Sequence, residues 1–263
     1  MSKKKAEDFA LKVAWIFHQS DYSKLRKAEG CGKLGDLPTT KKDKVNAYRA
    51  AKKMGIPDEE IHYWTGMSSK ELGKMIRKET HRLSDYTMAD KQVFLFVYCA
   101  GHGVADSQQY FVLNDASHNL FPVESKLRAM CKGSDGMFHI VAVYDICRSD
   151  LSKFKGLSRG DDSPHLEGGN GVNYVAINGT DPAGTVDAAS TLAVTLFAEC
   201  DEAASEHVNS LIRIPTCWVE FQGSNGMVEK TMMGKTYNIY WDTNAGGKPI
   251  SNDNQEEMKS APT

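Results

Sequence analysis

Short apolar runs alternate with segments of helical periodicity along this chain. Three runs are rich in β-branched and aromatic residues and are apolar on both faces, which is typical of strands buried on both sides of a parallel sheet. They cover residues 93–100, 139–145 and 172–177. Three further segments are predicted as strands, the first and last less completely buried: 11–17, 61–64 and 216–221.

Helical spacing of apolar residues is found in four segments: 45–54, 72–76, 189–197 and 208–212. Gly55 follows the first segment and suits a helix C-terminus. Ser68 and Glu71 precede the second with the spacing of a capping box. Pro215 ends the fourth. The alternation predicts an α/β fold, an open sandwich in which a mostly parallel sheet of about six strands carries helices on both faces.

The chain is expected to form a single domain over residues 1–243. Within it, a stretch rich in Gly, Ser and charge predicts a flexible loop at about 151–171. Residues 244–263 are polar and predict a frayed C-terminal tail. In an open α/β sheet, functional loops follow the carboxyl ends of the strands, so the chemistry is expected there.

Composition and net charge indicate which kinds of binding partner the chain is expected to have. The 263 residues carry 32 basic and 34 acidic side chains, and a net charge of -2 lacks the basic surplus that general nucleic-acid binders need. The longest apolar run, 93–100, is far shorter than the roughly 20 residues of a membrane span. The N-terminus has no signal-peptide h-region, and the six cysteines include no Cys-x-x-Cys pair. We therefore expect a cytoplasmic chain with reduced thiols and no contact with nucleic acid or membrane, and Cys99 is predicted to pack in the core.

Two strand ends carry reactive side chains. His102 follows the 93–100 run and lies between Gly101 and Gly103, a pattern that lets backbone approach a substrate closely. Cys147 follows the 139–145 run, and the cation of Arg148 beside it favours the thiolate. These residues predict a nucleophile and a general base for acyl transfer on a peptide, with the N–H groups of Gly103 and Cys147 as an oxyanion hole.

The two motifs, Tyr-Cys-Ala-Gly-His-Gly at 98–103 and Asp-Ile-Cys-Arg-Ser at 145–149, resemble those of the caspase, metacaspase and paracaspase superfamily of cysteine peptidases. His102 precedes Cys147 by 45 positions, close to the roughly 50 expected between the caspase histidine and cysteine. The resemblance covers about residues 10–222. It implies a caspase-like three-layer sandwich and a cysteine endopeptidase with catalytic His102 and Cys147.

The second motif is a hybrid. Asp145 stands where caspases have glutamine, as in metacaspases and paracaspases. Arg148 is kept where metacaspases usually have histidine, and Ser149 replaces the caspase glycine. The resemblance also implies that Asp43 and Asp181 line the pocket for the P1 side chain. An acidic pocket should attract Arg or Lys at P1. As alternatives, Asp145 could bond to backbone N–H groups at a strand end, and Asp43 could interact with a helix macrodipole.

A basic P1 preference would make Lys153, Lys155 and Arg159 self-cleavage candidates in the loop after Cys147. An aspartate-specific enzyme would instead cut at Asp161 or Asp162. Both outcomes concern the same loop, so the site of self-processing would report the P1 preference.

Three alternatives to a basic-specific peptidase remain open: an Asp-specific caspase-type peptidase, a catalytically silent scaffold or interaction protein, and a small-molecule acyl hydrolase. The sequence requires no cofactor and shows no metal site, although the resemblance to metacaspases raises activation by calcium. Protein or peptide substrates are the expected partners. Asp145 places the chain nearer to the metacaspases, which are generally monomeric, so a monomer is expected.

Overall fold

The computed structural model describes residues 9–27, 31, 34–106, 109–130, 137–147 and 149–158 together with six strands of the C-terminal part of the chain. These strands are β9 (Asn173–Asn178), β10 (Ala193–Phe197), β11 (Leu211–Ile214), β12 (Cys217–Gln222), β13 (Gly226–Met232) and β14 (Lys235–Trp241). For these six strands, backbone placement and pairing are described.

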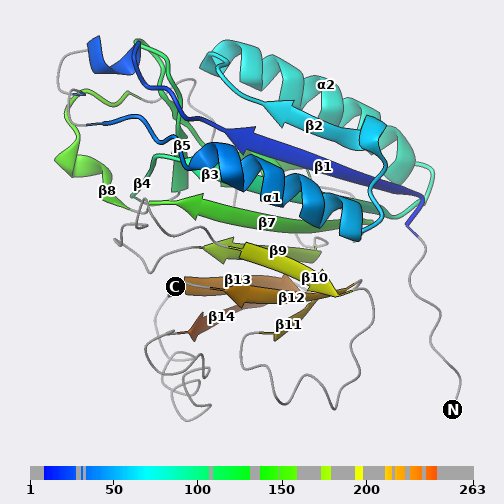
Figure 1. The fold of residues 1–263 in the computed structure, drawn as a ribbon. Coiled ribbons are helices and arrows are strands. Elements are labelled where there is room, and N and C mark those ends of the chain that lie inside the picture. The colour runs from blue at the N-terminus through cyan, green and yellow to red at the C-terminus, as the bar shows by residue number, and fades with distance from the viewer. Residues whose placement is uncertain are drawn as a thin grey trace, which may run out of the picture.

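The main sheet has seven strands in the order β14-β13-β9-β7-β3-β1-β2 (Figure 1). Its N-terminal members are β1 (Leu11–His18), β2 (Ile61–Trp64), β3 (Val93–Gly101) and β7 (Phe138–Ile146). The strands β2, β1, β3, β7 and β9 pair in parallel. β13 and β14 are added antiparallel at one side. The predicted α/β class with a mostly parallel sheet is therefore confirmed.

The main sheet has seven strands, which is close to the predicted number of about six. β13 and β14 were not anticipated, because polar residues interrupt their apolar ones and leave no continuous apolar run. The predicted strand at 216–221 exists as β12, but it belongs to a separate three-stranded sheet of order β10-β12-β11.

The helices predicted at 189–197 and 208–212 are wrong. The chain forms β10 and β11 there, and each pairs antiparallel with β12. Short apolar segments fit a strand and a helix equally well by periodicity, and the available partner strand decides between them. Pro215 lies just after β11, where a strand can end as readily as a helix.

In the described part of the chain, three α-helices cover the two faces of the main sheet: α1 (Thr40–Lys53), α2 (Ser69–Thr87) and α3 (Val123–Met130). The buried alanines of α1 pack with Ala14, Ile16 and Phe96 on one face. α2 and α3 pack on the opposite face, against Trp15 and Val97 among others. The predicted helices on both faces are thus confirmed. No helix in the described part of the chain has the length and apolar character that crossing a bilayer requires.

The predicted helix ends are also present. Ser68 and Glu71 form the capping box, with the Ser68 N–H donating to Glu71 Oε2 at 2.9 Å and the Glu71 N–H donating to Ser68 Oγ at 3.3 Å. Gly55 follows α1 with a φ of +74°, a left-handed conformation that glycine adopts without strain.

A small sheet of order β6-β5-β4-β8 lies at the carboxyl edge of the main sheet and was not predicted. It contains β4 (Gly103–Ala105), β5 (Gln109–Val112), β6 (Leu120–Phe121) and β8 (Ser149–Asp150), and three 3-10 helices complete the described elements: η1 (Leu25–Lys27), η2 (Asp58–Glu60) and η3 (Leu151–Lys153). A separate apolar cluster joins this small sheet to the segment before α1 through residues such as Tyr22, Leu34 and Val112.

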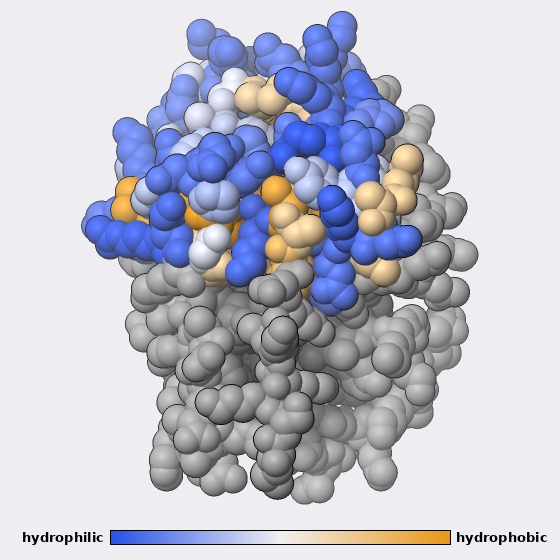
Figure 2. Space-filling model, turned by 90° about the vertical axis from the view of Figure 1, so that its right-hand side faces the viewer, coloured by the Kyte–Doolittle hydropathy of each residue, from blue (hydrophilic) through white to orange (hydrophobic). Residues whose placement is uncertain are grey.

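The remaining surface follows the usual division of polar and apolar residues. Figure 2 shows one face of the molecule, and the described part of that face carries mainly hydrophilic residues with smaller hydrophobic areas between them. Large apolar side chains that are exposed include Val45, Tyr63 and Met88. The apolar residues of β3 and β7, including Cys99 as predicted, are instead buried.

Replacing Gly73 by alanine is expected to stabilise the protein. Gly73 lies inside α2, and a Cβ there would meet nothing closer than the flexible end of Arg77 at 3.7 Å. Alanine in a helix interior is favoured over glycine by about 0.5–1 kcal/mol. Thermal or urea unfolding should show a higher stability for Gly73→Ala, and a lower one would mean that the helix position is more crowded than its geometry indicates.

Candidate active site

His102 and Cys147 lie at matching positions on adjacent parallel strands. β3 and β7 are paired up to Gly101 and Ile146, and each reactive residue is the next one along its strand. Both side chains are partly exposed. The structure therefore brings the predicted dyad residues together at the carboxyl edge of the sheet.

The glycines on either side of His102 are required by close packing. A Cβ on Gly103 would overlap the carbonyl oxygen of Cys147 and would lie 2.8 Å from Ile146 Cβ. A Cβ on Gly101 would lie 2.7 Å from the Tyr22 hydroxyl. Any larger residue at position 103 would push the two strand ends apart.

The imidazole of His102 is held in one orientation. Its Nε2 lies 2.8 Å from the carbonyl oxygen of Gly35. A carbonyl oxygen only accepts hydrogen bonds, so Nε2 carries the proton and the lone pair is on Nδ1. Burial lowers the pKa of His102, and the Gly35 carbonyl and the charge of Asp36 oppose that shift. The neutral ring with a basic Nδ1 is the form that a general base needs.

The N–H of Gly103 points away from β5. Gly103 pairs with Phe111, and the neighbouring hydrogen bond runs from the Val112 N–H to the His102 carbonyl at 3.0 Å. In an antiparallel ladder this marks the Gly103–Phe111 pair as non-hydrogen-bonded. The Gly103 N–H is thus directed to the side of β4 where β8 pairs and where Cys147 approaches.

Two predicted pocket residues, Asp43 and Asp145, are buried near each other on the α1 side of the sheet. Asp43 lies in the first turn of α1, where a carboxylate can interact with the helix macrodipole, as one alternative predicted. The residue is nevertheless buried, with only 4% of its surface exposed. Asp145 is 7% exposed and accepts a hydrogen bond from the Tyr98 hydroxyl at 3.0 Å. Oδ1 of Asp43 is buried without a hydrogen-bond partner in the described structure.

The charge of Asp145 affects the ionisation of Asp43. Burial, and then the negative charge of Asp145, raises the pKa of Asp43 to about 7. Burial and the same two carboxylates raise the pKa of Tyr98 well above its ordinary value, so the phenol stays a neutral donor. A buried pair of carboxylates is costly unless a cation approaches it. This arrangement can therefore accept a positively charged group.

His18, the last residue of β1, adds another polar side chain on this face. Strand alternation puts it on the same side as Ala14 and Ile16, and its partner in the register is Ala100, which pairs with Asp145 on the next strand. It is 8% exposed, and neither ring nitrogen has a hydrogen-bond partner in the described structure. Burial and the charges of Lys44 and Lys41 lower the pKa of His18.

The structure describes only some of the other predicted site residues. Asp181 and Arg159 lie outside the described residues. Lys153 ends η3, and Lys155 follows it with an exposed side chain. The apolar residues between and around these lysines pack on the same cluster as Tyr22: Leu151, Phe154 and Leu157. In the described ranges, no group of three or more His, Cys, Asp or Glu side chains is arranged to hold a metal ion.

Four residues of the site were missed by sequence reasoning: Tyr22, Gly35, Tyr98 and His18. Tyr98 and His18 each carry a polar group near the carboxyl end of a mainly apolar strand, a signal that could have marked them. Tyr22 and Gly35 come from an irregular segment whose path the periodicity of the sequence does not reveal.

Comparison with known proteins gives no relative by sequence. No family model matches the chain, and no curated protein matches it. By structure, the chain is similar to caspase-1 from Spodoptera frugiperda, with a TM-score of 0.45 and 15% sequence identity. The match covers 70% of this chain and 66% of the caspase chain, so the chain spans somewhat less than two thirds of that protein.

Proposed function

We propose that this chain is a caspase-like cysteine endopeptidase with Cys147 as nucleophile and His102 as general acid and base. The observation that carries the proposal is the placement of the two residues one step beyond the paired ends of β3 and β7. The Gly35 carbonyl, which occupies Nε2, supports it because Nδ1 is left as the basic nitrogen.

In the proposed reaction, the Cys147 thiol transfers its proton to Nδ1 of His102 as the sulfur attacks the scissile carbonyl carbon. The N–H groups of Gly103 and Cys147 stabilise the oxyanion of the tetrahedral intermediate. The imidazolium then protonates the leaving amine as the C–N bond breaks. Water, deprotonated by His102, hydrolyses the resulting thioester and restores the thiol.

We further propose that the pocket around Asp43 and Asp145 takes the side chain of an Arg or Lys at P1, with Asp181 as a third candidate wall. The buried, unpartnered Oδ1 of Asp43 supports a cationic ligand. The proximity of Asp145, which raises the pKa of Asp43, supports it as well. A P1 cation would pair with both carboxylates and offset the cost of burying them.

Hydrolysis of matched fluorogenic peptides ending in Arg, Lys or Asp tests the proposal, with Cys147→Ala as the inactive control. Cleavage after Arg or Lys that is lost in Cys147→Ala supports both the dyad and the acidic pocket. Cleavage after Asp retains the dyad and rejects the pocket. A folded protein that cleaves none of the peptides, with and without calcium, favours the scaffold alternative.

The preference for a P1 cation is expected to increase as pH rises through about 7, the pKa of Asp43. Below that pH the carboxyl is protonated and attracts a cation weakly, whereas above it the carboxylate pairs with Arg. The ratio of kcat/KM for P1 Arg to that for P1 citrulline isolates this effect, because dyad titration affects both substrates alike. A ratio that is constant between pH 5.5 and 8.5 would contradict the role of Asp43.

We propose Arg159, in preference to Lys153 and Lys155, as the site of self-processing. Proteases bind extended backbone, whereas the segment holding the two lysines is packed through Leu151 and Phe154. The end of this segment is also held in place, because the Ser158 N–H donates a hydrogen bond to Asn119 Oδ1 at 2.9 Å. Arg159 is the first candidate beyond this packed segment. Mass spectrometry of fragments from the wild type and Cys147→Ala would identify the site.

Activation by calcium, which the resemblance to metacaspases raises, is a further proposal. Calcium therefore remains one arm of the peptide assay. Protein or peptide substrates and a monomeric state also remain proposals, and sedimentation at micromolar concentration would determine the oligomeric state.

A further inference from the structure

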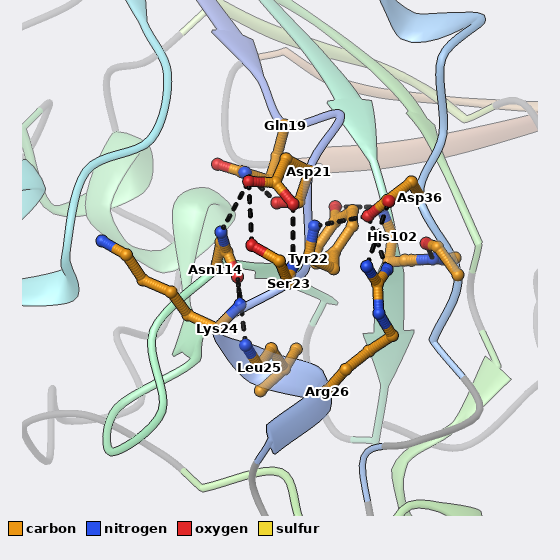
Figure 3. A network of polar contacts seen from close by, with 11 residues as sticks. Gln19, Asp21, Tyr22, Ser23, Lys24, Leu25, Arg26, Asp36, His102 and Asn114 are labelled. Carbon is orange, nitrogen blue, oxygen red and sulfur yellow. Dashed lines mark hydrogen bonds and ion pairs between the residues drawn. The ribbon is translucent and has the colours of Figure 1, made fainter.

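The segment between β1 and α1 surrounds His102 with groups that fix its position (Figure 3). Tyr22, Gly35 and Asp36 from this segment form what we call the His102 bracket. Each member contacts His102 or another member of the bracket. This segment lies far from His102 in the sequence, so the contacts depend on the fold.

Tyr22 holds both the backbone and the ring of His102. Its hydroxyl oxygen accepts a hydrogen bond from the His102 N–H at 2.7 Å. Its ring lies against the imidazole, with centroids 4.6 Å apart and planes tilted by 53°. Tyr22 is fully buried, and burial raises the pKa of its phenol, which therefore stays neutral. Gly101 is needed here because a side chain would collide with the Tyr22 hydroxyl.

Asp36 connects the two contacts of the bracket with His102. Its Oδ1 accepts a hydrogen bond from the Tyr22 N–H at 2.8 Å. It is also the residue after Gly35, whose carbonyl oxygen binds Nε2 at 2.8 Å. The guanidinium of Arg26 donates to both carboxylate oxygens, at 2.6 and 3.1 Å. The Asp36 carboxylate thus holds the backbone of Tyr22 in place. Because Arg26 fixes this carboxylate, Asp36 also restrains the adjoining Gly35 carbonyl that binds His102.

We propose that Tyr22 and Asp36 are positioning residues for His102, which hold the imidazole in the Nε2–H tautomer with Nδ1 directed for proton transfer. This inference rests on the proposed function, in which Nδ1 takes the proton of Cys147. A carboxylate that acts on a catalytic histidine through a backbone carbonyl can set its tautomer without touching it. Arg26 holds the carboxylate in place and lies at the surface.

Electrostatics agree with this role. Among the described residues, the charged and titratable groups around His102 are Asp36 and Arg26 from the segment before α1, Tyr22 beside the ring, and Cys147 just after β7. Burial lowers the pKa of His102, while the Gly35 carbonyl and the Asp36 charge favour the imidazolium. The bracket therefore makes it easier for His102 to receive a proton during the reaction.

Nitrogen-15 NMR of histidine-labelled protein tests the proposal without requiring catalysis. The eight histidines are distinguished by comparison with a His102→Gln sample. We expect the wild-type His102 ring to be in the Nε2–H tautomer. Tyr22→Phe and Asp36→Asn should both shift the signals toward a mixture of tautomers, and Asp36→Asn should also lower the pKa of His102.

Asp21→Asn is the matched control. Asp21 lies in the same segment and accepts hydrogen bonds from Ser23 through its backbone N–H and its hydroxyl, at 2.8 and 3.1 Å (Figure 3). The hydrogen bonds of its side chain in the described structure go to Ser23 and Asn114, so its replacement should leave the tautomer of His102 unchanged. An unchanged tautomer in both Tyr22→Phe and Asp36→Asn, or a wild-type ring protonated on Nδ1, would overturn the proposal.

Kinetics give the second measurement. With a cleaved peptide, kcat should fall by about 10- to 100-fold in Tyr22→Phe and Asp36→Asn, because small displacements of a catalytic group have effects of this size. KM should stay within about twofold, since the bracket does not contact the proposed pocket. A change confined to KM would contradict a positioning role. A wild type that cleaves no peptide but retains the tautomer pattern would reject the proposed function and leave the bracket intact.

Discussion

Replacing Gly103 by alanine is expected to reduce peptide hydrolysis at least about 100-fold, because a displacement of a catalytic group by about 1 Å can have this effect. The added Cβ would overlap the backbone carbonyl oxygen of Cys147 and would lie 2.8 Å from Cβ of Ile146, the last residue of β7. Backbone atoms cannot rotate away as a side-chain tip can. The strand end that carries His102 must therefore move away from Cys147.

The structural cost of Gly103→Ala should be moderate. Insertion of a methyl group into a packed site typically costs about 1–3 kcal/mol. The variant should thus unfold at a lower temperature but remain folded under assay conditions, and this can be followed by circular dichroism. Activity is measured with the best peptide of the P1 panel on protein shown to be folded.

Gly73→Ala is the control for this experiment, because a Cβ at position 73 meets only open space and a flexible side-chain end. It should keep full activity and gain stability. Full activity in Gly103→Ala would show that the close approach of β4 to Cys147 is not needed for catalysis. It would also remove the structural reason for glycine beside His102.

Asp145→Asn is expected to lower kcat/KM for a P1 Arg peptide by about 10²- to 10³-fold, since loss of one partner from a buried charge pair costs about 2–5 kcal/mol. The effect on a P1 citrulline peptide should be much smaller. Asn has nearly the shape of Asp and can still accept the hydrogen bond of the Tyr98 hydroxyl. The loss would therefore report charge and not a collapsed pocket.

Asp145→Asn should also shift the pH at which the Arg-to-citrulline ratio of kcat/KM rises. The charge of Asp145 is one of the two causes that raise the pKa of Asp43, so its removal should lower that pKa. The rise of the Arg-to-citrulline ratio would then occur at lower pH than in the wild type. Asp58→Asn is a suitable control, because Asp58 is an exposed carboxylate that pairs with Lys52 and Tyr48 beyond the end of α1. Equal losses for Arg and citrulline peptides in Asp145→Asn would count against the acidic pocket.

The two predictions test different parts of the proposed enzyme. Gly103→Ala disturbs the distance between the dyad residues and should affect all substrates alike. Asp145→Asn leaves the backbone in place and should discriminate between substrates by charge. Together they would separate the chemistry of Cys147 and His102 from the recognition of P1.

Much of the parallel sheet was predictable from the sequence, because strands buried on both faces must be apolar on both faces. This is why 93–100 and 139–145 were assigned correctly as β3 and β7. The capping box of Ser68 and Glu71 was predictable for a similar reason, since its hydrogen bonds join residues three positions apart. Local patterns of this kind do not depend on the rest of the fold.

The β10 and β11 segments show where local patterns fail. Their few apolar residues fit a helix as well as a strand, and hydrogen bonding to β12, which no local pattern encodes, determines the outcome. β13 and β14 were missed because they alternate with polar residues and are stabilised by pairing with each other and with β9. Backbone hydrogen bonds between distant segments are a tertiary property.

The site divides in the same way. Local signals in the sequence are sufficient to predict His102 and Cys147 as the reactive residues, since one lies between two glycines and the other follows an apolar strand, and both follow strand ends in the structure. Only the tertiary structure decided that Gly35, Tyr22 and Asp36 surround the imidazole, and that Asp43 meets Asp145 across α1 and β7. These contacts join segments tens of residues apart, so their geometry exists only after the sheet has ordered its strands and the helices have packed on it.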